Sequence, residues 1–372
     1  MTAELYIGLM SGTSLDGVDG VLVDLADDRI AVRGHAAAAF PAELRSELLA
    51  LNTAGDNELH RAALAGNALV RLYASVVDQL LTAAGMRADA VTAIGAHGQT
   101  VRHRPGEFDG IGYTLQLNQA GLLAELCGID VVADFRSRDV AAGGQGAPLV
   151  PAFHHAAFGL PDSASCVLNI GGIANLSVLP PGGSDVIGFD CGPGNVLLDA
   201  WCLRHTGLPY DAEGRWAAGG RVLPALLAGC LAEPYFDRSP PKSTGRDLFH
   251  RDWLAQRLDA SGVGAPAPAD VQATLAQLTA ETCARAVSRH GLGAATHHQH
   301  GGALNTDLMQ RIRTLLPGVA VVSSNERGLP PLEVEATAFA WLARRLLRGE
   351  PGNLPKVTGA RGARLLGAVY RA

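Results

Sequence analysis

The sequence feature that most constrains the fold is a pattern repeated at the start of each half of the chain. In both halves an apolar segment is followed by a glycine-containing turn, a second apolar segment, another turn and a third apolar segment. These segments are 4–10, 18–25 and 30–38 in the first half and 165–170, 175–179 and 186–190 in the second. Short apolar runs bounded by turns predict strands. A repeat on this scale indicates two similar lobes rather than a solenoid with a period of about 20–50 residues.

Amphipathic segments follow these strands in both halves and predict helices. The longest are 59–84, 270–290 and 332–348. Strands mixed with crossover helices imply mixed sheets covered by helices. We therefore predict an α/β fold of two lobes, with duplicated mixed sheets and a cleft between the lobes. We expect an N-terminal lobe over 1–150 and a C-terminal lobe over 151–372, with the last helix either in the latter or packed back onto the former.

The composition excludes several classes of protein. The chain has 372 residues, 48% of them hydrophobic, which is too apolar for a disordered protein. No segment approaches the ~20 consecutive apolar residues that span a bilayer. The net charge is −6, so we expect no nucleic-acid or membrane partner. The only lysines are Lys242 and Lys356, and neither follows a Gly-x-x-x-x-Gly run, which excludes a P-loop of the Walker type.

Two further features concern the cellular compartment. The six cysteines are scattered without a C-x-x-C pair, so we expect neither a zinc ribbon nor a disulfide framework. The N-terminal residues lack a cationic region followed by an apolar core, so we expect no signal peptide. Both features favour a reduced, cytoplasmic location.

The turn of the first half lies in the sequence GLMSGTSLDGVD, residues 8–19. A glycine such as Gly12 can adopt a positive φ, and successive backbone N–H groups in such a turn form a nest that binds anions. Thr13 and Ser14 add hydroxyl donors, and Asp16 and Asp19 could hold a metal ion that is bound to phosphates. Taken alone, the segment is also consistent with an ordinary hairpin turn.

The second half has a matching turn in NIGGIANL, residues 169–176. Two adjacent glycines between strands have little structural purpose unless a backbone or a ligand approaches closely. Two lobes that each present a glycine turn can clamp a polyphosphate, which favours phosphate binding over two unrelated turns. The chain has 45 glycines where an average composition gives about 26, and we interpret the surplus as turns at strand ends that approach phosphate or sugar.

A carboxylate, Asp190, ends a predicted strand in GFDCGPGN, and Asn195 begins the next helix. A strand-end carboxylate beside a helix N-terminus is well placed to face a substrate in an α/β lobe. Its natural role is that of a general base near a phosphoryl acceptor, and the alternative is a helix cap. The turn HGGALN at 300–305 could lie against an adenosine moiety or simply start a helix.

Other polar side chains are candidates for binding a sugar. Gln99 and Thr100 could bind sugar hydroxyls. Arg136 could pair with a carboxylate of the substrate through its forked donors, or could form an ion pair at the surface. Glu335 lies off the apolar stripe of the last predicted helix and is either solvated or directed into the cleft.

Taken together, these segments resemble the motifs of one family, the anhydro-N-acetylmuramic acid kinases. The similar segments, in order, are GLMSGTSLDGVD, AHGQTVRHRP, DFRSRDVAAGGQGAPLVP, NIGGIANL, GFDCGPGN, PPKSTGRDLF, EATAFAWLA and NLPKVTGA. The resemblance runs from Gly8 to about Ala360. It implies a two-lobed homodimer of the actin-like ATPase and sugar kinase (ASKHA) architecture. Such an enzyme would use ATP, Mg²⁺ and water to convert 1,6-anhydro-N-acetylmuramic acid to N-acetylmuramic acid 6-phosphate in cell-wall recycling.

The resemblance also implies roles for single residues. Asp190 is expected to be the catalytic base, and Glu335 is expected to help position the water. Gln99, Thr100 and Arg136 are expected to contact the sugar, with Arg136 facing its lactate carboxylate.

The nucleotide is expected to bind in the glycine turns, with Asp16 as the metal ligand. The expected cofactor-binding residues are Gly12, Thr13, Ser14, Leu15, Asp16, Gly17, Val18, Asp19, Gly171, Gly172, Asn175, Gly301 and Gly302. One of these segments departs from the family pattern, because His300 stands where the family usually has a glycine. Two other functions remain open on the residues alone, a kinase for an ordinary amino-sugar hydroxyl and an actin-like nucleotide switch.

Overall fold

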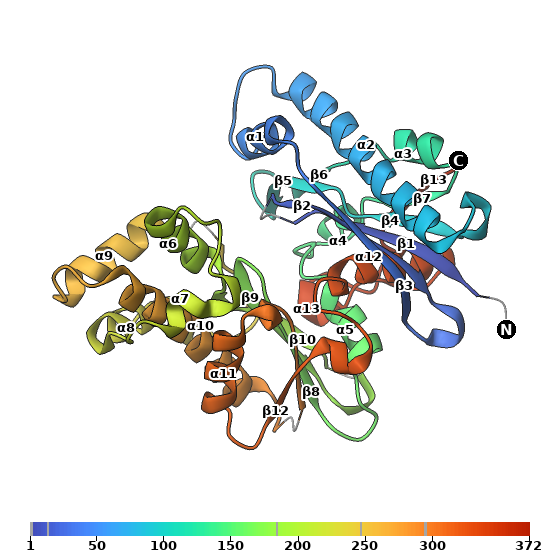
Figure 1. Ribbon diagram of the computed structural model, residues 1–372. Helices are drawn as coiled ribbons and strands as arrows, with labels where there is room; N and C mark the ends of the chain where they lie inside the picture. Colours follow the sequence, from blue (N-terminus) through green and yellow to red (C-terminus); the bar gives the residue numbers. More distant parts are fainter. Residues whose placement is uncertain (1–2, 13–14, 184, 246–247, 294–295) are drawn as a thin grey trace. The chain divides into compact units, whose positions relative to one another are not determined.

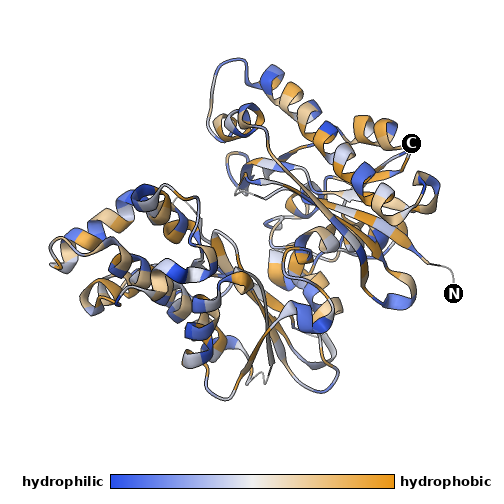
Figure 2. Ribbon diagram, viewed as in Figure 1, coloured by the Kyte–Doolittle hydropathy of each residue, from blue (hydrophilic) through white to orange (hydrophobic). Residues whose placement is uncertain are grey.

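The computed structural model describes residues 3–12, 15–183, 185–245, 248–293 and 296–372. The chain divides into two compact units, one of Met1–Phe153 with Leu332–Ala372 (unit 1) and one of His154–Pro331 (unit 2). Figure 1 shows that each unit combines a sheet with helices, and Figure 2 shows hydrophobic residues along the strands of both sheets. None of the helices in the described ranges is long and apolar enough to cross a membrane.

Over the described residues, unit 1 forms a mixed sheet with the strand order β13-β7-β4-β1-β2-β3 and a small sheet of β5 and β6. The strands are β1 (Leu5–Met10), β2 (Gly17–Asp24), β3 (Ala31–Ala39), β4 (Ala93–Ala96), β5 (Gln99–Pro105), β6 (Gly112–Leu117), β7 (Val131–Ala133) and β13 (Ala368–Tyr370). The central strand β1 is antiparallel to β2 and parallel to β4, β2 is antiparallel to β3, and β4 is parallel to β7.

Unit 2 forms, within the same described ranges, a mixed sheet with the order β10-β9-β8-β11-β12. The strands are β8 (Ser165–Ile170), β9 (Ile173–Leu179), β10 (Ile187–Pro193), β11 (Thr296–Gly301) and β12 (Ala320–Ser323). The central strand β8 is antiparallel to β9 and parallel to β11, β9 is antiparallel to β10, and β11 is parallel to β12. This order matches β3-β2-β1-β4-β7 of unit 1 strand for strand. The predicted α/β fold with duplicated mixed sheets is therefore confirmed.

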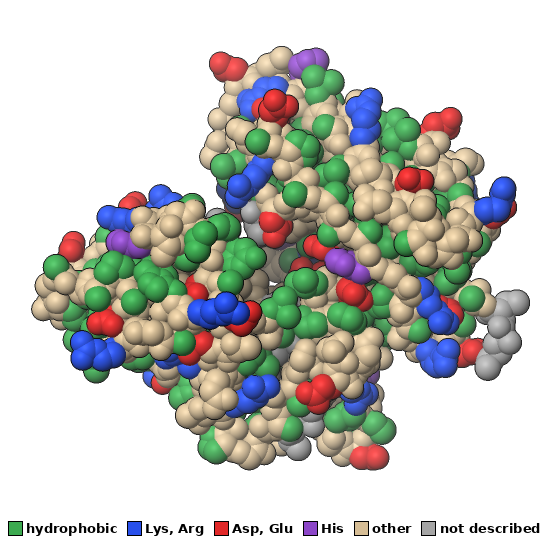
Figure 3. Space-filling view, viewed as in Figure 1, with side chains coloured by type: hydrophobic (Ala, Val, Ile, Leu, Met, Phe, Trp, Pro, Cys, Tyr) green, Lys and Arg blue, Asp and Glu red, His purple; other side chains and the backbone are tan. Residues whose placement is uncertain are grey.

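The helices lie between and after these strands. In unit 1 they are α1 (Ala42–Ala50), α2 (Glu58–Ala84), α3 (Ala120–Cys127), α4 (Ser137–Ala141), α12 (Val334–Leu347) and α13 (Pro355–Thr358), and α5 (Val150–Phe158) crosses the boundary between the units. In unit 2 they are α6 (Val196–Thr206), α7 (Arg215–Ala218), α8 (Pro224–Leu231), α9 (Arg251–Ser261), α10 (Pro268–His290) and α11 (Thr306–Leu315). Figure 3 shows cationic and anionic side chains interspersed on the visible surface of both units.

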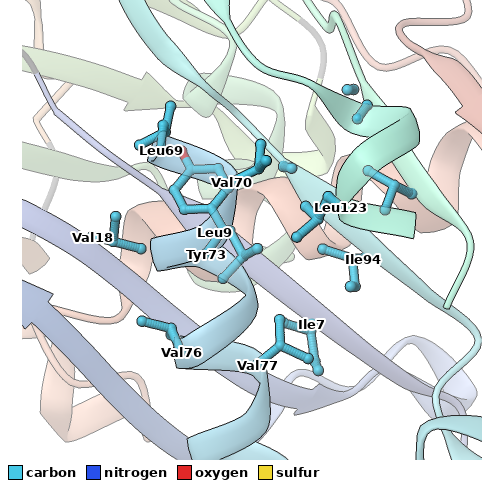
Figure 4. Packing of buried hydrophobic residues seen from close by; sticks show 14 of the residues in the cluster. Ile7, Leu9, Val18, Leu69, Val70, Tyr73, Val76, Val77, Ile94 and Leu123 are labelled. Atoms are coloured by element: carbon cyan, nitrogen blue, oxygen red, sulfur yellow. The ribbon is translucent and has the colours of Figure 1, made fainter. Parts of the chain in front are cut away.

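The two faces of β1 pack in different ways. Successive side chains of a strand point to opposite faces of its sheet. Ile7 and Leu9 are fully buried in one apolar cluster with Tyr73 of α2, and Figure 4 shows this packing. Gly8 faces the other side, where a Cβ atom would lie 1.9 Å from the carbonyl oxygen of Ala336 in α12. The helix therefore lies directly on the backbone of β1.

Strand β4 repeats this close approach. Gly95 is the register partner of Gly8, and a Cβ atom there would lie 2.1 Å from the carbonyl oxygen of Phe339 in α12. Gly8 thus lies within a strand under a helix, and our interpretation of the glycine surplus as turns near a ligand is wrong for this residue. The close approach also holds Leu332–Ala372 in unit 1.

The observed units differ from the expected lobes at two places. The chain passes from unit 1 to unit 2 after Phe153 rather than after residue 150, and the last segment belongs to unit 1 rather than to the lobe expected over 151–372. The cause is tertiary contact, because α12 packs on β1 and β4 and β13 pairs with β7. This agrees with the alternative that the last helix packs back onto the N-terminal lobe. The expected cleft between the lobes stays a prediction.

Candidate active site

The first glycine turn joins β1 to β2 in unit 1, and buried polar side chains hold it in place. The Ser11 hydroxyl donates to the carbonyl oxygen of Gly98 at 3.1 Å, and the Tyr73 hydroxyl lies 3.0 Å from the same Ser11 oxygen. The side-chain amide of Gln99 donates to the carbonyl oxygen of Gly12 at 3.1 Å. These bonds fix the start of the turn. The predicted donors Thr13 and Ser14 lie outside the described residues.

The rest of the predicted phosphate-binding run lies in and beside β2. Leu15 and Val18 have buried side chains, so only their backbone groups can face a ligand. Asp16 is exposed and accepts the N–H of the next residue at 3.0 Å. Asp19 bonds His35 of β3 at 3.1 Å, and this bond raises the pKa of His35. Asp16 is thus exposed, whereas Asp19 is engaged with His35.

A single carboxylate such as Asp16 suits Mg²⁺, which proteins usually hold through one or two carboxylates together with substrate phosphates. Among the described residues, no three His, Cys, Asp or Glu side chains gather into a site that could hold a metal ion without a substrate. The side chains present therefore fit a magnesium ion shared with a nucleotide.

Arg136 immediately precedes α4, and uncharged acceptors bind its guanidinium. Its Nε and Nη2 atoms lie 3.1 and 3.0 Å from Nε2 of His97, and Nη1 donates to the carbonyl oxygen of Gly146 at 2.8 Å. Burial lowers the pKa of Arg136 to about 10, against the attraction of Glu335. Burial and the arginine's charge hold the pKa of His97 well below its usual value. At neutral pH Arg136 is therefore charged and His97 is neutral.

The two polar residues that follow Gly98 differ in exposure. Gln99 is 1% exposed and braces Gly12, and its Oε1 atom is buried without a partner among the described residues. Thr100 is half-buried in β5, and its hydroxyl accepts a bond from the amide of Gln116 at 3.1 Å. Their expected contacts with a sugar stay predictions.

Glu335 lies in the first turn of α12 and is half-buried. Its charge acts on Arg136, which belongs to the same unit. The first turn of a helix favours a carboxylate, because the N-terminal end of the helix dipole is positive. The structure thus brings Glu335 into the electrostatic environment of the candidate carboxylate-binding arginine.

In unit 2 the second glycine turn joins β8 to β9 and is bonded to the motif that ends β10. The carbonyl oxygen of Gly171 accepts the N–H of Asn195 at 2.8 Å, and that of Gly172 accepts the N–H of Gly194 at 2.9 Å. A Cβ atom on Gly194 would lie 2.3 Å from the Gly171 oxygen, so only glycine permits this approach. The two motifs that the sequence presents separately form one structural element.

Three polar residues form a row across the sheet of unit 2. Asn175 of β9 is the register partner of Asn169 of β8 on one side and of Asp190 of β10 on the other. Each of the three is half-buried. Gly302 follows β11, and a Cβ atom there would lie 3.0 Å from Cβ of Ile170, which places it at the end of β8. The structure therefore brings Gly171, Gly172, Asn175, Asp190, Gly301 and Gly302 onto or beside neighbouring strands of one sheet.

The expectation that Asp190 ends a strand is wrong, because β10 continues to Pro193 and Asp190 lies in its middle, beside an irregularity in the pairing between Asp190 and Gly192. Backbone groups hold it there. Its carboxylate accepts the N–H of Thr244 at 3.0 Å, and its carbonyl oxygen accepts the hydroxyl of the buried Tyr235 at 2.8 Å. Burial raises the pKa of Asp190 to about 6, while the Thr244 bond and the charge of Lys242 oppose this shift. A carboxyl group with a pKa near neutrality can both accept and release a proton under physiological conditions.

Sequence reasoning gave no role to several residues that support the site. His97 holds Arg136, Thr244 and Tyr235 hold Asp190, and Asp139 accepts bonds from three groups. His97, Asp139 and Thr244 do lie in motifs that the resemblance covers, and this was the only signal for them. Asn169 was likewise part of the second glycine motif.

Similarity to known proteins identifies one family. A family model described as anhydro-N-acetylmuramic acid kinase matches residues 4–372. A protein of that name from Variovorax paradoxus (strain S110) is 65% identical over 377 residues, covering 100% of both chains. One from Cupriavidus pinatubonensis (strain JMP 134 / LMG 1197) is 60% identical over 368 residues, covering 99% of this chain and 98% of the relative. One from Bordetella pertussis (strain Tohama I / ATCC BAA-589 / NCTC 13251) is 59% identical over 374 residues, covering 99% and 96%.

Solved structures show a weaker similarity. The activator of the 2-hydroxyisocaproyl-CoA dehydratase from Clostridium difficile with bound ADPNP is 11% identical with a TM-score of 0.45, covering 94% of this chain and 99% of that chain. A ROK family glucokinase from Streptomyces griseus in complex with glucose and AMPPNP is 14% identical with a TM-score of 0.40, covering 91% and 99%. Because both TM-scores are below 0.5, we assign the fold from the strand order of the two sheets and not from these structures.

Proposed function

Because the chain belongs to the anhydro-N-acetylmuramic acid kinase family, we propose that it transfers the γ-phosphoryl group of ATP to O6 of 1,6-anhydro-N-acetylmuramic acid while water opens the anhydro bridge. The products are N-acetylmuramic acid 6-phosphate and ADP. The substrate is a cell-wall sugar, so we assign the reaction to peptidoglycan recycling. We also propose that the protein acts in the cytoplasm as a homodimer.

The observation that carries the proposal is the half-buried Asp190, which accepts the Thr244 N–H and whose pKa burial raises to about 6. A general base works best when its pKa lies near the operating pH, because it is then both deprotonated and basic enough to take a proton. The Thr244 N–H bonds its carboxylate and the Tyr235 hydroxyl bonds its backbone carbonyl oxygen, and these two bonds hold the residue within β10. Its proposed role is to accept a proton from the attacking water.

The two bond changes support each other chemically. The oxygen of water attacks the anomeric carbon C1, the C1–O6 bond breaks, and Asp190 takes the water proton as C1 gains oxocarbenium character. The released O6 attacks the γ-phosphorus, whose bond to the bridging oxygen breaks to give ADP. Because O6 passes directly from carbon to phosphorus, no separate general acid needs to protonate it. Glu335 is proposed to orient the water.

The glycine turns are the proposed site for the ATP phosphates. Gly12, Leu15, Gly17, Val18 and Asp19 would contribute backbone groups from unit 1, and Gly171, Gly172 and Asn175 would contribute from unit 2. Asp16 would hold Mg²⁺, which neutralises charge on the transferring phosphoryl group. Thr13 and Ser14 complete the predicted run. Gly301 and Gly302 are proposed to face the adenosine.

The sugar is proposed to bind through side chains of unit 1. Arg136 keeps a full charge at neutral pH, because its pKa of about 10 lies well above that value. A fixed, charged guanidinium is the group best suited to bidentate pairing with a carboxylate. We assign it to the lactate carboxylate of the sugar, and Gln99 and Thr100 to its hydroxyl groups.

The test is a product assay with 1,6-anhydro-N-acetylmuramic acid, ATP and Mg²⁺ in ¹⁸O-labelled water. We expect ADP and a 6-phosphate whose C1 hydroxyl carries ¹⁸O, because water must attack C1. A phosphorylated product without ¹⁸O at C1 would instead indicate a kinase of an ordinary hydroxyl. ADP release that does not depend on the sugar would indicate a nucleotide switch, and either result would overturn the proposal.

A further inference from the structure

Asp139 is a fully buried carboxylate to which the proposed reaction gives no role. It is 0% exposed and lies in α4, near Arg136 in sequence. One carboxylate oxygen accepts the backbone N–H of Gly146 at 2.8 Å. The other accepts the amide of Asn353 at 2.6 Å and the hydroxyl of Thr358 at 2.8 Å. A buried charge is tolerated when such bonds compensate its lost hydration.

These bonds hold the loop that contains Gly146 between two parts of unit 1. The N–H of Gln145 donates to the carbonyl oxygen of Thr358 at 2.7 Å, which adds a backbone bond to the same contact. A Cβ atom on Gly144 would lie 2.2 Å from Oδ2 of Asp139, so the loop wraps closely around the carboxylate. The position of Gly146 therefore depends on Asp139 and on the C-terminal segment.

Gly146 in turn positions Arg136. Its carbonyl oxygen accepts a bond from Nη1 of Arg136 at 2.8 Å, while His97 accepts the bonds from Nε and Nη2 on the other side. The guanidinium thus has two fixed acceptors, and a planar group held at two points has a defined orientation. Asp139 binds the N–H of the same residue whose carbonyl oxygen binds the arginine.

The arginine has capacity left for an anion. Of the five N–H groups of a guanidinium, three are used in these bonds, and one remains on each of Nη1 and Nη2. Within the described parts of the chain, no carboxylate oxygen lies within 4.0 Å of its nitrogen atoms. A carboxylate can pair with two such donors on one guanidinium.

We propose that Asp139 is a positioning residue that sets the enzyme's selectivity for a sugar carrying a carboxylate, by fixing Gly146 and through it the orientation of Arg136. The proposal rests on the function proposed above, because it takes the sugar's lactate group as the anion that Arg136 binds. It adds to that function a residue that touches neither substrate and a segment, 353–358, that connects the end of the chain to the specificity of the site.

The test compares Asp139→Asn with the wild-type protein by steady-state kinetics. We expect KM for 1,6-anhydro-N-acetylmuramic acid to rise about tenfold or more, since a bidentate charged contact is worth at least that factor. We expect KM for ATP to stay within about twofold, because the loop does not join the glycine turns. The inhibition constant of 1,6-anhydro-N-acetylglucosamine, which lacks the lactate group, should also stay within about twofold.

Two further variants make the result decisive. Asp134→Asn is the matched control, because Asp134 is an exposed aspartate of the same segment that accepts the N–H of Ser137. The KM of this variant for the anhydro sugar should not change. Thr358→Val removes one of the three bonds to Asp139 with little change of shape, and it replaces Asp139→Asn in the comparison if that variant does not fold. We expect a smaller rise of the same KM.

The outcomes separate this inference from the proposed function. A rise in KM for the carboxylated sugar alone supports it. Equal changes for the sugar and ATP, or none, in a folded variant would overturn it and leave the proposed function standing. A wild-type protein that phosphorylates no anhydro sugar would overturn both.

Discussion

The two units share one strand order but bury groups of opposite charge. In unit 1 burial lowers the pKa of Arg136 to about 10, and in unit 2 burial raises the pKa of Asp190 to about 6. Desolvation acts against the charged form in both cases. Because the guanidinium starts from a far higher pKa, it remains charged at neutral pH. The pKa of the carboxyl group instead reaches a value at which the group can exchange protons near neutral pH. The same physical cause is in keeping with the roles proposed for the two residues, Arg136 in binding and Asp190 in chemistry.

The units also differ in how their sheets are covered. Strand β1 of unit 1 carries Gly8, which lets α12 rest on the strand backbone. Strand β8, the corresponding strand of unit 2, contains no glycine. A helix that arrives from the far end of the sequence therefore completes unit 1. This difference and the difference in charge can each be tested by substitution.

The largest effect is expected at Asp190. Asp190→Asn keeps an oxygen that can accept the Thr244 N–H but removes the base, so kcat should fall by about 10²–10⁴-fold. ADP release in the presence of the anhydro sugar measures this. Asp259→Asn is the control, because Asp259 is an exposed aspartate of α9 in the same unit. Near-normal turnover in Asp190→Asn would refute the assignment of the base.

The covering of unit 1 can be disrupted at Gly8. Gly8→Ala places a methyl group 1.9 Å from the Ala336 carbonyl oxygen, so α12 or β1 must move. Overpacking of this kind should lower the free energy of unfolding by about 3 kcal/mol, which denaturant unfolding would measure. Gly34→Ala is the control, since its nearest neighbour would lie 3.8 Å away. Equal stability of the two variants would mean that α12 does not depend on the bare strand.

The raised pKa of Asp190 predicts how stability and activity depend on pH. Between the ordinary pKa of 3.8 and the folded value of about 6, the folded state binds the proton more tightly, so stability falls as pH rises through this range. Asp190→Asn should remove this loss and raise the free energy of unfolding at pH 8 by up to about 3 kcal/mol. In the wild type, kcat/KM should fall about tenfold per pH unit below about pH 6. A kcat/KM profile that stays flat down to pH 5 would contradict the raised pKa of Asp190, on which both expectations rest.

The smallest effect is expected from Lys242. Its charge lowers the pKa of Asp190 against the effect of burial. Lys242→Met should therefore move the acid limb of kcat/KM to higher pH, by less than about one unit. Arg215→Met, which removes an exposed ion pair with Glu213 beside α7 of unit 2, is the control and should leave the limb in place. A shift of the limb to lower pH would show that Lys242 does not act through its charge on Asp190.

Much of the fold followed from local patterns. The apolar runs and turns at the start of each half became β1 to β3 and β8 to β10, because short apolar segments between glycine turns have few alternatives to a buried strand. Asp190 could be singled out because it directly follows such a run. Strands β12 and β13 were not predicted, since runs this short have no distinguishing period.

The sequence by itself determined the α/β class and the duplication and singled out Asp190, since each depends on residues close together in the chain. Only the tertiary structure decided that Leu332–Ala372 completes unit 1. It also decided that Asp139 joins Gly146 to Asn353 and Thr358, and that burial brings the pKa of Asp190 to about 6. These features depend on contacts between distant segments and on the exclusion of water, and local sequence patterns predict neither.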